Sequence, residues 1–310
     1  MKLKILKKWS NGYNIIDPKL YVTLVPFLWM CVFFIMPLLI VLKISFSEAI
    51  FSMPPFSDVF SSRADFMLNI QLNFKNYYTI LNDSYYMSVF VNSISLSTVA
   101  TTLCVLLGYP MAYGIYCVDS SRLKSVLILM ISLSFWTSFL IRVYSLVNLL
   151  NIRGVINSVL IKLGIISNPI QFLGNYFVVC LGFVFCYLPF VILPIYASLG
   201  KVKKAYNEAA IDLGCDTMRV FWKITFPLSL PGVLTGCVIV FTASLGEFII
   251  PELLGNANTI TFGRALWMEF FTNLDWPMAC ALSIVMMVYI IFSVYILKKL
   301  SESSVFETSN

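Results

Sequence analysis

Histidine is absent from the 310 residues of the chain. Without an imidazole the chain cannot build Ser-His-Asp or Cys-His nucleophiles, His-based acid–base catalysis or an HExxH zinc site. The phosphate-loop pattern G-x-x-x-x-G-K-[ST] is missing too, which excludes ATP binding of that type. The eight cysteines form no C-x-x-C pair and lie mostly within apolar runs, where they act as small packing residues. We therefore expect no catalytic centre, no metal site and no cofactor.

Charged residues are also scarce. They make up 12% of the chain, whereas soluble domains carry roughly 25%. Hydrophobic residues reach 59%, and the mean hydropathy is +0.87. Because so few charges cannot cover a water-facing surface, the chain belongs in a bilayer. The formal net charge of +6 then informs on topology rather than on nucleic acid, and we expect no nucleic-acid partner.

Six stretches are long and apolar enough to cross a bilayer, which takes about 20 mostly apolar residues in a helix. We predict the spans at roughly 21–43, 87–117, 124–148, 173–199, 229–250 and 277–297. The predicted fold class is therefore an all-α membrane protein with six transmembrane helices in one domain, 21–300. Residues 1–20 and 301–310 are predicted to be tails, and the loop 44–86 to be irregular with short helical pieces.

The basic residues indicate which ends of the spans face the cytoplasm. With the N-terminus inside, the cytoplasmic segments hold most of the 21 Lys and Arg residues: Lys2, Lys4, Lys7, Lys8, Lys19, Arg122, Lys124, Lys201, Lys203, Lys204, Arg219, Lys223, Lys298 and Lys299. The positive-inside rule then places both termini and the loop 201–228 in the cytoplasm. The basic start of the chain runs into an apolar stretch of spanning length. We interpret it as an uncleaved cytoplasmic tail rather than a signal peptide.

A polar cassette, EAAIDLGCDTMRVFWKITFP, separates the fourth and fifth spans at 208–227. Asn207 is a candidate cap for a first short helix, and Gly214 would end that helix in the left-handed conformation that glycine tolerates best. Asp216 would cap a second, amphipathic helix, which Pro227 would stop before the fifth span. The cassette therefore predicts a helix–turn–helix at the cytoplasmic membrane surface. An ordinary interfacial loop with snorkelling basic side chains is the alternative.

The spacing within this cassette resembles the EAA loop of binding-protein-dependent ABC importer permeases. The matching positions are Glu208, Ala209, Ala210, Gly214, Ile224 and Pro227, while Phe226 stands where leucine is usual. Ala209 and Ala210 would leave a bare patch that another surface can approach. In that family the loop docks into a cleft of a separate ATPase subunit, which agrees with the missing phosphate loop. The resemblance implies the type I (MetI-like) importer permease fold, with 201–228 as the ATPase-coupling loop.

Further segments resemble the permease subunits of spermidine/putrescine importers. They are LGYPMAY (107–113), SFWTSFLIRVYS (134–145), LPFVILPIYASL (188–199), GEFIIPELLG (246–255) and DWPMACALSI (275–284). The resemblance implies a polyamine substrate and a multi-pass place among the lipids of the bacterial inner membrane. It also implies three kinds of partner: a second related permease, a dimer of ATPase subunits and a periplasmic substrate-binding protein.

A polyamine is a cation with apolar spacers, so its path should offer carboxylates and aromatic faces. Glu247 is the one acidic residue inside a predicted span, about 27 Å above the cytoplasmic start of its helix, and is a functional candidate at that depth. Trp136, about 18 Å up the third span, shares a helix face with Leu140 and Tyr144. The alternatives are an interface Glu that contacts water or an Arg, and aromatics that serve helix packing or an interface belt.

Three more charged residues bear on the path of a cationic solute. Glu252 and Glu269 fall in the predicted outer loop, where they could meet the binding protein or the arriving substrate, or remain solvated loop charges. Arg142 on the third span would repel a cation unless it is paired, and we interpret it as structural or interface-anchoring.

Other functions stay open at this point. A permease of the same class could carry iron, thiamine or an inorganic anion, although Glu247 argues mildly against an anion. A membrane-embedded enzyme is disfavoured by the absence of histidine and of a carboxylate cluster at membrane depth. A self-powered secondary carrier would lack a second homologous half and would leave the cassette unexplained.

Overall fold

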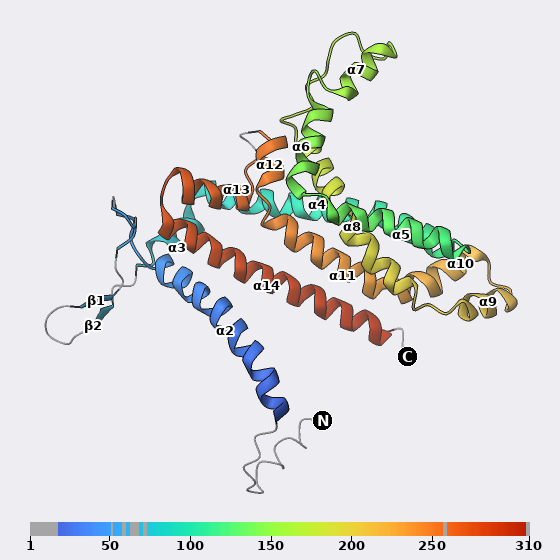
Figure 1. Cartoon of the computed structure of the whole chain (residues 1–310), viewed down its shortest axis with the longest axis horizontal. Coiled ribbons are helices and arrows are strands. Elements are labelled where there is room, and N and C mark those ends of the chain that lie inside the picture. Colours follow the sequence, from blue (N-terminus) through green and yellow to red (C-terminus); the bar gives the residue numbers. More distant parts are fainter. Residues whose placement is uncertain are drawn as a thin grey trace, which may run out of the picture.

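The structure is a computed structural model that describes residues 18–50, 52–57, 60–62, 68–70, 73–256 and 259–307. Most of the predicted N-terminal tail and the last residues of the predicted C-terminal tail lie outside these ranges. The described part is helical apart from one small β hairpin (Figure 1). Within it, six helical stretches are long and apolar enough to cross a membrane, which confirms the six-span prediction.

The helices follow in chain order: α2 (Pro18–Ser45), α3 (Lys75–Asn82), α4 (Ser84–Cys117), α5 (Ser121–Trp136), α6 (Phe139–Leu150), α7 (Val155–Lys162), α8 (Tyr176–Leu199), α9 (Lys204–Asp212), α10 (Thr217–Val220), the π-helix η1 (Phe221–Thr225), α11 (Phe226–Leu245), α12 (Ile249–Leu254), α13 (Phe262–Trp267), the π-helix η2 (Met268–Thr272) and α14 (Trp276–Glu307). Between α2 and α3, strands β1 (Phe60–Ser62) and β2 (Leu68–Ile70) pair antiparallel. This hairpin is an addition to the predicted all-helical fold, within a loop that was expected to hold only irregular and helical pieces.

The third predicted span, 124–148, is not one helix. It is divided between α5 and α6 by Thr137 and Ser138, whose backbones are extended. The Thr137 hydroxyl donates to the Ser134 carbonyl, so a side chain satisfies the backbone where the helix stops. With 16 residues, α5 is about 24 Å long and shorter than a hydrocarbon core of about 30 Å. The third stretch of spanning length in the structure is Phe139–Lys162, which begins with α6, rather than the predicted 124–148. Figure 1 shows α5 running beside α4 and α6 turning sharply away from it.

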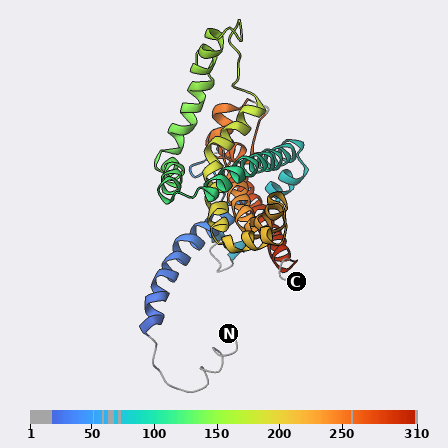
Figure 2. The ribbon, with the colours of Figure 1, turned by 90° about the vertical axis from the view of Figure 1, so that its right-hand side faces the viewer.

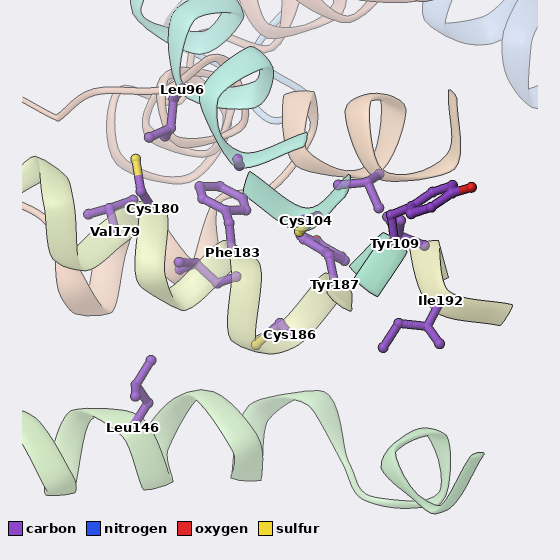
Figure 3. Packing of buried hydrophobic residues seen from close by; sticks show 14 of the residues in the cluster. Leu96, Cys104, Tyr109, Leu146, Val179, Cys180, Phe183, Cys186, Tyr187 and Ile192 are labelled. Atoms are coloured by element: carbon purple, nitrogen blue, oxygen red, sulfur yellow. The ribbon is translucent and has the colours of Figure 1, made fainter. Parts of the chain in front are cut away.

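The core of the molecule lies where α8 packs against α4 and α11. Phe183, Ile192, Ile195 and Leu199 of α8 are all fully or almost fully buried. Figure 3 shows Phe183 and Tyr187 of α8 beside Cys104 of α4, with Leu146 of α6 on the other side of α8. This helix is therefore the most enclosed span, whereas α2 packs along α14 with none of its most apolar stretch buried. Figure 2 shows α2 and the arm formed by α6 and α7 extending away from the other helices.

Glycines allow the backbone of α11 to touch that of α8. A Cβ on Gly232 would lie 2.5 Å from the Ser198 Cβ and 2.6 Å from the Pro194 carbonyl oxygen. A Cβ on Gly236 would lie 3.2 Å from the Val191 Cα. Small residues at such points give membrane helices their close packing, because no hydrophobic force holds apolar helices together in lipid.

We predict that Gly232→Ala destabilises the protein, because neither a backbone carbonyl nor a Cα can move aside without separating α8 from α11. Overpacking of this kind costs about 1–3 kcal/mol. The matched control is Gly114→Ala in α4, where an added Cβ meets nothing within 4 Å. Thermal unfolding of the purified protein in detergent should show a clearly lower midpoint for Gly232→Ala only. Equal midpoints for the two variants would contradict the packing described here.

Candidate functional site

The cassette at 208–227 begins as a helix–turn–helix beyond the end of α8 (Figure 1). Helix α9 ends at Asp212, α10 begins at Thr217, and Gly214 between them has a φ of 84°. A Cβ on Gly214 would meet nothing within 4 Å, so the position demands a left-handed backbone rather than space. The predicted turn at this glycine is confirmed.

The predicted cap of the first cassette helix is wrong. Helix α9 begins at Lys204, before Asn207, and the residue that precedes it, Lys203, makes no side-chain cap hydrogen bond. The Asn207 Oδ1 instead accepts a hydrogen bond of 3.4 Å from the hydroxyl of Thr225, which lies in η1. Asn207 thus connects the two arms of the helical hairpin, which consists of α9 on one side of the turn and α10 with η1 on the other.

Pro227 does not stop the second cassette helix, contrary to the prediction. Helices α10, η1 and α11 form one helical stretch from Thr217 to Leu245. The π-helical turn η1 lies just before Pro227, and the Phe226 N–H donates to the Phe221 carbonyl five residues earlier. The wider turn makes room for a proline ring that would clash with the carbonyl four residues earlier in an α-helix.

The hairpin exposes large apolar side chains that the sequence pattern did not single out. Leu213, beside the turn, is 85% exposed. Other exposed apolar residues on the hairpin are Tyr206, Ile211, Met218 and Trp222. Among the predicted loop positions, Glu208, Ala209 and Gly214 are exposed, and Ile224 and Pro227 are half-buried. Ala210 is buried, so only Ala209 contributes to the expected bare patch. Exposed apolar side chains of this kind fit either the membrane surface or the surface of another protein.

Aromatic rings connect the base of the hairpin to the core. Phe221 of η1 packs edge-on against Tyr113 at 5.1 Å and against Tyr109 at 5.9 Å, both on α4. Phe226 lies 5.5 Å from Tyr109, whose hydroxyl pairs with the Ser229 hydroxyl at 3.0 Å. A displacement of the hairpin would therefore be passed directly to α4.

The aromatic face predicted on the third span is interrupted by the helix break. Trp136 is the last residue of α5, whereas Leu140 and Tyr144 lie on α6, so the three no longer follow one helical face. Trp136 is 85% exposed, and Tyr144 is exposed as well. Neither ring belongs to the core, which leaves both available to a partner chain, lipid or solute.

Arg142 of α6 has a structural role, as predicted. Its Nη1 donates to the Ser134 hydroxyl and to the Cys186 carbonyl, both at 3.2 Å. Its guanidinium also lies 5.8 Å from the centroid of the Phe139 ring. Arg142 therefore joins α5, α6 and α8 across the break.

Glu247 is not inside a helix, contrary to the predicted fifth span. Helix α11 ends at Leu245, and Glu247 lies in the short bend before α12. Its Oε2 accepts from the Tyr187 hydroxyl at 2.7 Å, and its Oε1 accepts from the Ile249 N–H at 2.8 Å. The half-buried carboxylate is thus oriented by two donors at the end of α11 opposite the hairpin.

The two carboxylates predicted for the outer loop belong to ordered helices. Glu252 lies in α12 and forms an ion pair with Arg264 of α13. Glu269 lies in η2, is only 9% exposed and accepts from the Tyr86 hydroxyl at 2.8 Å and from the Asn273 side chain at 2.8 Å. Glu269 is therefore enclosed, whereas Glu252 is exposed and its ion pair lies at the surface. Among the described residues, no group of three or more Asp, Glu, Cys or His side chains is placed to hold a metal ion.

The structure also contains a cluster of stacked aromatic rings near these carboxylates, which the sequence pattern did not predict. Trp267 stacks on Phe248 with centroids 4.6 Å apart and contacts Phe271 at 4.1 Å. Phe270 stacks on Trp276 at 5.1 Å. The i, i+3, i+4 spacing of Trp267, Phe270 and Phe271 carries the signal for this cluster. These rings pack on one another and fasten the bend after α11 to η2 and α14.

Known proteins of similar sequence decide the family. Residues 14–306 match the family described as "Binding-protein-dependent transport system inner membrane component". The chain belongs to this family. It is therefore a multi-pass component of the inner membrane, as the resemblance of its polar cassette implied.

Two curated members of the family are similar along much of their length. The spermidine/putrescine transport system permease protein PotB of Haemophilus influenzae is 34% identical over 88% of this chain and 92% of its own length. PotB of Escherichia coli is 35% identical over 67% of this chain and 75% of its own length. A solved structure, a bacterial alginate ABC transporter in complex with alginate pentasaccharide-bound periplasmic protein, matches with a TM-score of 0.69 at 19% identity. It covers 92% of this chain and 96% of the matched one, and confirms the ABC importer permease fold.

We predict that Glu269→Ala destabilises the end of the molecule opposite the hairpin, where η2 packs against α4. The substitution removes the acceptor of the Tyr86 hydroxyl inside the protein, and an unsatisfied buried donor costs about 1–3 kcal/mol. Glu208→Ala is the control, because Glu208 is exposed. Thermal unfolding in detergent should show a lower midpoint for Glu269→Ala and no change for Glu208→Ala. An unchanged midpoint for Glu269→Ala would show that this carboxylate is not needed for packing.

Proposed function

We propose that the chain is a channel-forming permease subunit of an ATP-driven importer of the polyamines putrescine and spermidine. The observation that carries the proposal is the 34% identity to PotB of Haemophilus influenzae, which extends over 92% of that protein. The oriented Glu247 carboxylate supports a cationic solute, since it could accept an ammonium group where the path opens outward.

The power for transport comes, in this proposal, from a separate dimer of ATPase subunits. The missing phosphate loop and the exposed apolar hairpin support this division of labour, because the hairpin offers a surface on which another protein can dock. A second related permease would complete the channel, and a periplasmic binding protein would deliver the solute.

The proposed orientation places both termini and the hairpin formed by α9 and α10 in the cytoplasm. Helix α8 connects α7 to α9, so these two helices lie at opposite ends of a span. The distribution of Lys and Arg assigns the α9 end to the inside. Glu247, Glu252 and Glu269 then lie toward the outside.

We propose Glu247, Trp136 and Tyr144 as residues of the polyamine path. Glu247 supplies a carboxylate, and the two exposed rings supply faces for cation–π contact and for the methylene spacers. Glu252 and Glu269 have a different task in this account. Their ion pair with Arg264 and hydrogen bond from Tyr86 shape the outer mouth rather than leaving free charge for the solute.

The test of this function is uptake of radiolabelled putrescine and spermidine by a host that lacks its own polyamine importers. Expression of the chain with the ATPase, partner permease and binding protein encoded beside it should produce uptake. Omitting this chain should abolish uptake, and the purified chain alone should not hydrolyse ATP. Absence of polyamine uptake, together with uptake of iron, thiamine or an inorganic anion by the same assembled complex, would overturn the polyamine assignment.

The turn in the hairpin gives a second prediction. Gly214→Val forces a β-branched residue toward a left-handed conformation, which costs about 1–2 kcal/mol, and should shift α10 relative to α9. Uptake and co-purification of the ATPase should both fall at least several-fold. The matched control is Gly164→Val, since Gly164 has a φ of 70° and equally open surroundings but lies on the α7 side. Equal losses in the two variants would indicate general strain and argue against a coupling role for the hairpin.

A further inference from the structure

Tyr187 stands where the two interrupted spans meet. It is a residue of α8, 7% exposed, in the most enclosed helix of the molecule. The first interruption is the break between α5 and α6, and the second is the bend between α11 and α12. Tyr187 contacts both: its hydroxyl reaches Glu247 in the bend, and its ring packs 6.2 Å from the ring of Phe139, the first residue of α6.

On the side of the bend, the Glu247 carboxylate has one donor from the backbone and one from a side chain. The backbone donor, the Ile249 N–H, belongs to the same turn and moves with Glu247. The Tyr187 hydroxyl is the donor from another helix, at 2.7 Å. Tyr187 therefore determines where the carboxylate lies relative to α8 and the rest of the core.

The bend itself is held close to α13. The Thr261 hydroxyl donates to the Glu247 carbonyl at 3.2 Å, and a Cβ on Gly263 would lie 2.5 Å from the Gly246 carbonyl oxygen. These contacts position the backbone of the bend and do not involve the carboxylate of Glu247. The carboxylate is held by the Ile249 N–H of its own turn and by the Tyr187 hydroxyl, which links it to α8.

On the side of the break, the ring of Tyr187 is enclosed by other rings. Phe183 stacks on it at 5.9 Å, and Phe190 lies at 6.1 Å. The neighbouring carbonyl, that of Cys186, accepts from Arg142 of α6. Because backbone groups freed at a helix break need partners inside the protein at membrane depth, this packing keeps the α6 end against α8.

We infer that Tyr187 is a positioning residue for translocation. Its hydroxyl holds the Glu247 carboxylate in the position that receives the ammonium group of the solute. Its ring packs against Phe139 at the start of α6 and so keeps the hydroxyl in place. The inference rests on the proposed function. It adds a residue from a different helix, α8, on which recognition of the cation depends. Tyr187 is almost fully buried and need not touch the solute.

The test is a double-mutant cycle with Tyr187→Phe and Glu247→Gln in the complete complex, with uptake measured over a range of putrescine and spermidine concentrations. Tyr187→Phe keeps the ring and its packing and removes only the hydroxyl. Loss of a hydrogen bond to a charged group corresponds to about a ten-fold effect, which should appear as a raised KM with little change in maximal rate. Glu247→Gln should weaken uptake by a similar factor, and the double variant should be no worse than Glu247→Gln alone.

The matched control is Tyr77→Phe, which removes a hydroxyl bonded to the Ser45 hydroxyl at 2.7 Å between α3 and α2. It should leave KM unchanged. Three results would overturn the inference while wild-type uptake stands. Two of them are a KM in Tyr187→Phe equal to that of wild type, and losses in the double variant that multiply. A loss of maximal rate alone that follows the amount of folded complex would also overturn it, because that is the effect of a purely structural residue. Absence of polyamine uptake by the wild-type complex would instead refute the proposed function.

Discussion

The close approach of α8 to its neighbours is the constraint on which the other features depend. Gly232 and Gly236 bring the backbone of α11 against α8, and α4 packs along the same helix. These contacts hold α8 closely against the core along its length. The half of α8 around Tyr187 carries the groups that secure the two interrupted spans, and its C-terminal end leads through residues 200–203 into α9. One enclosed helix therefore connects the position of Glu247 to that of the hairpin.

The two ends of the molecule are built from different chemistry. At the end opposite the hairpin, carboxylates are hydrogen-bonded by tyrosines, with Tyr187 on Glu247 and Tyr86 on Glu269. At the hairpin end, the contacts are mainly between rings, and apolar side chains such as Leu213 remain exposed. This division suits a chain that handles a charged solute on one side of the membrane and a protein partner on the other.

Much of this could be predicted because the signals are local. Apolar runs of spanning length predicted the number of crossings, although the third lies at Phe139–Lys162 rather than at 124–148. The spacing in 208–227 predicted the hairpin and its left-handed glycine. The failures occur where tertiary contacts decide. Ser134 and Thr137 end α5 with help from Arg142, which hydropathy cannot register. A π-helical turn lets the helix run through Pro227, although a proline inside a helix ordinarily predicts a stop.

The central claim is that the hairpin between α8 and α11 is where an ATPase subunit docks, and a native cysteine allows a direct measurement. Cys215 follows Gly214 in the turn and is exposed. The measurement is the rate at which a membrane-impermeant maleimide labels Cys215 in inside-out vesicles, read by mass spectrometry, with and without the co-expressed ATPase subunits. The account predicts rapid labelling of the chain alone and strong protection in the assembled complex. Equal labelling rates in vesicles that retain the bound ATPase would contradict it.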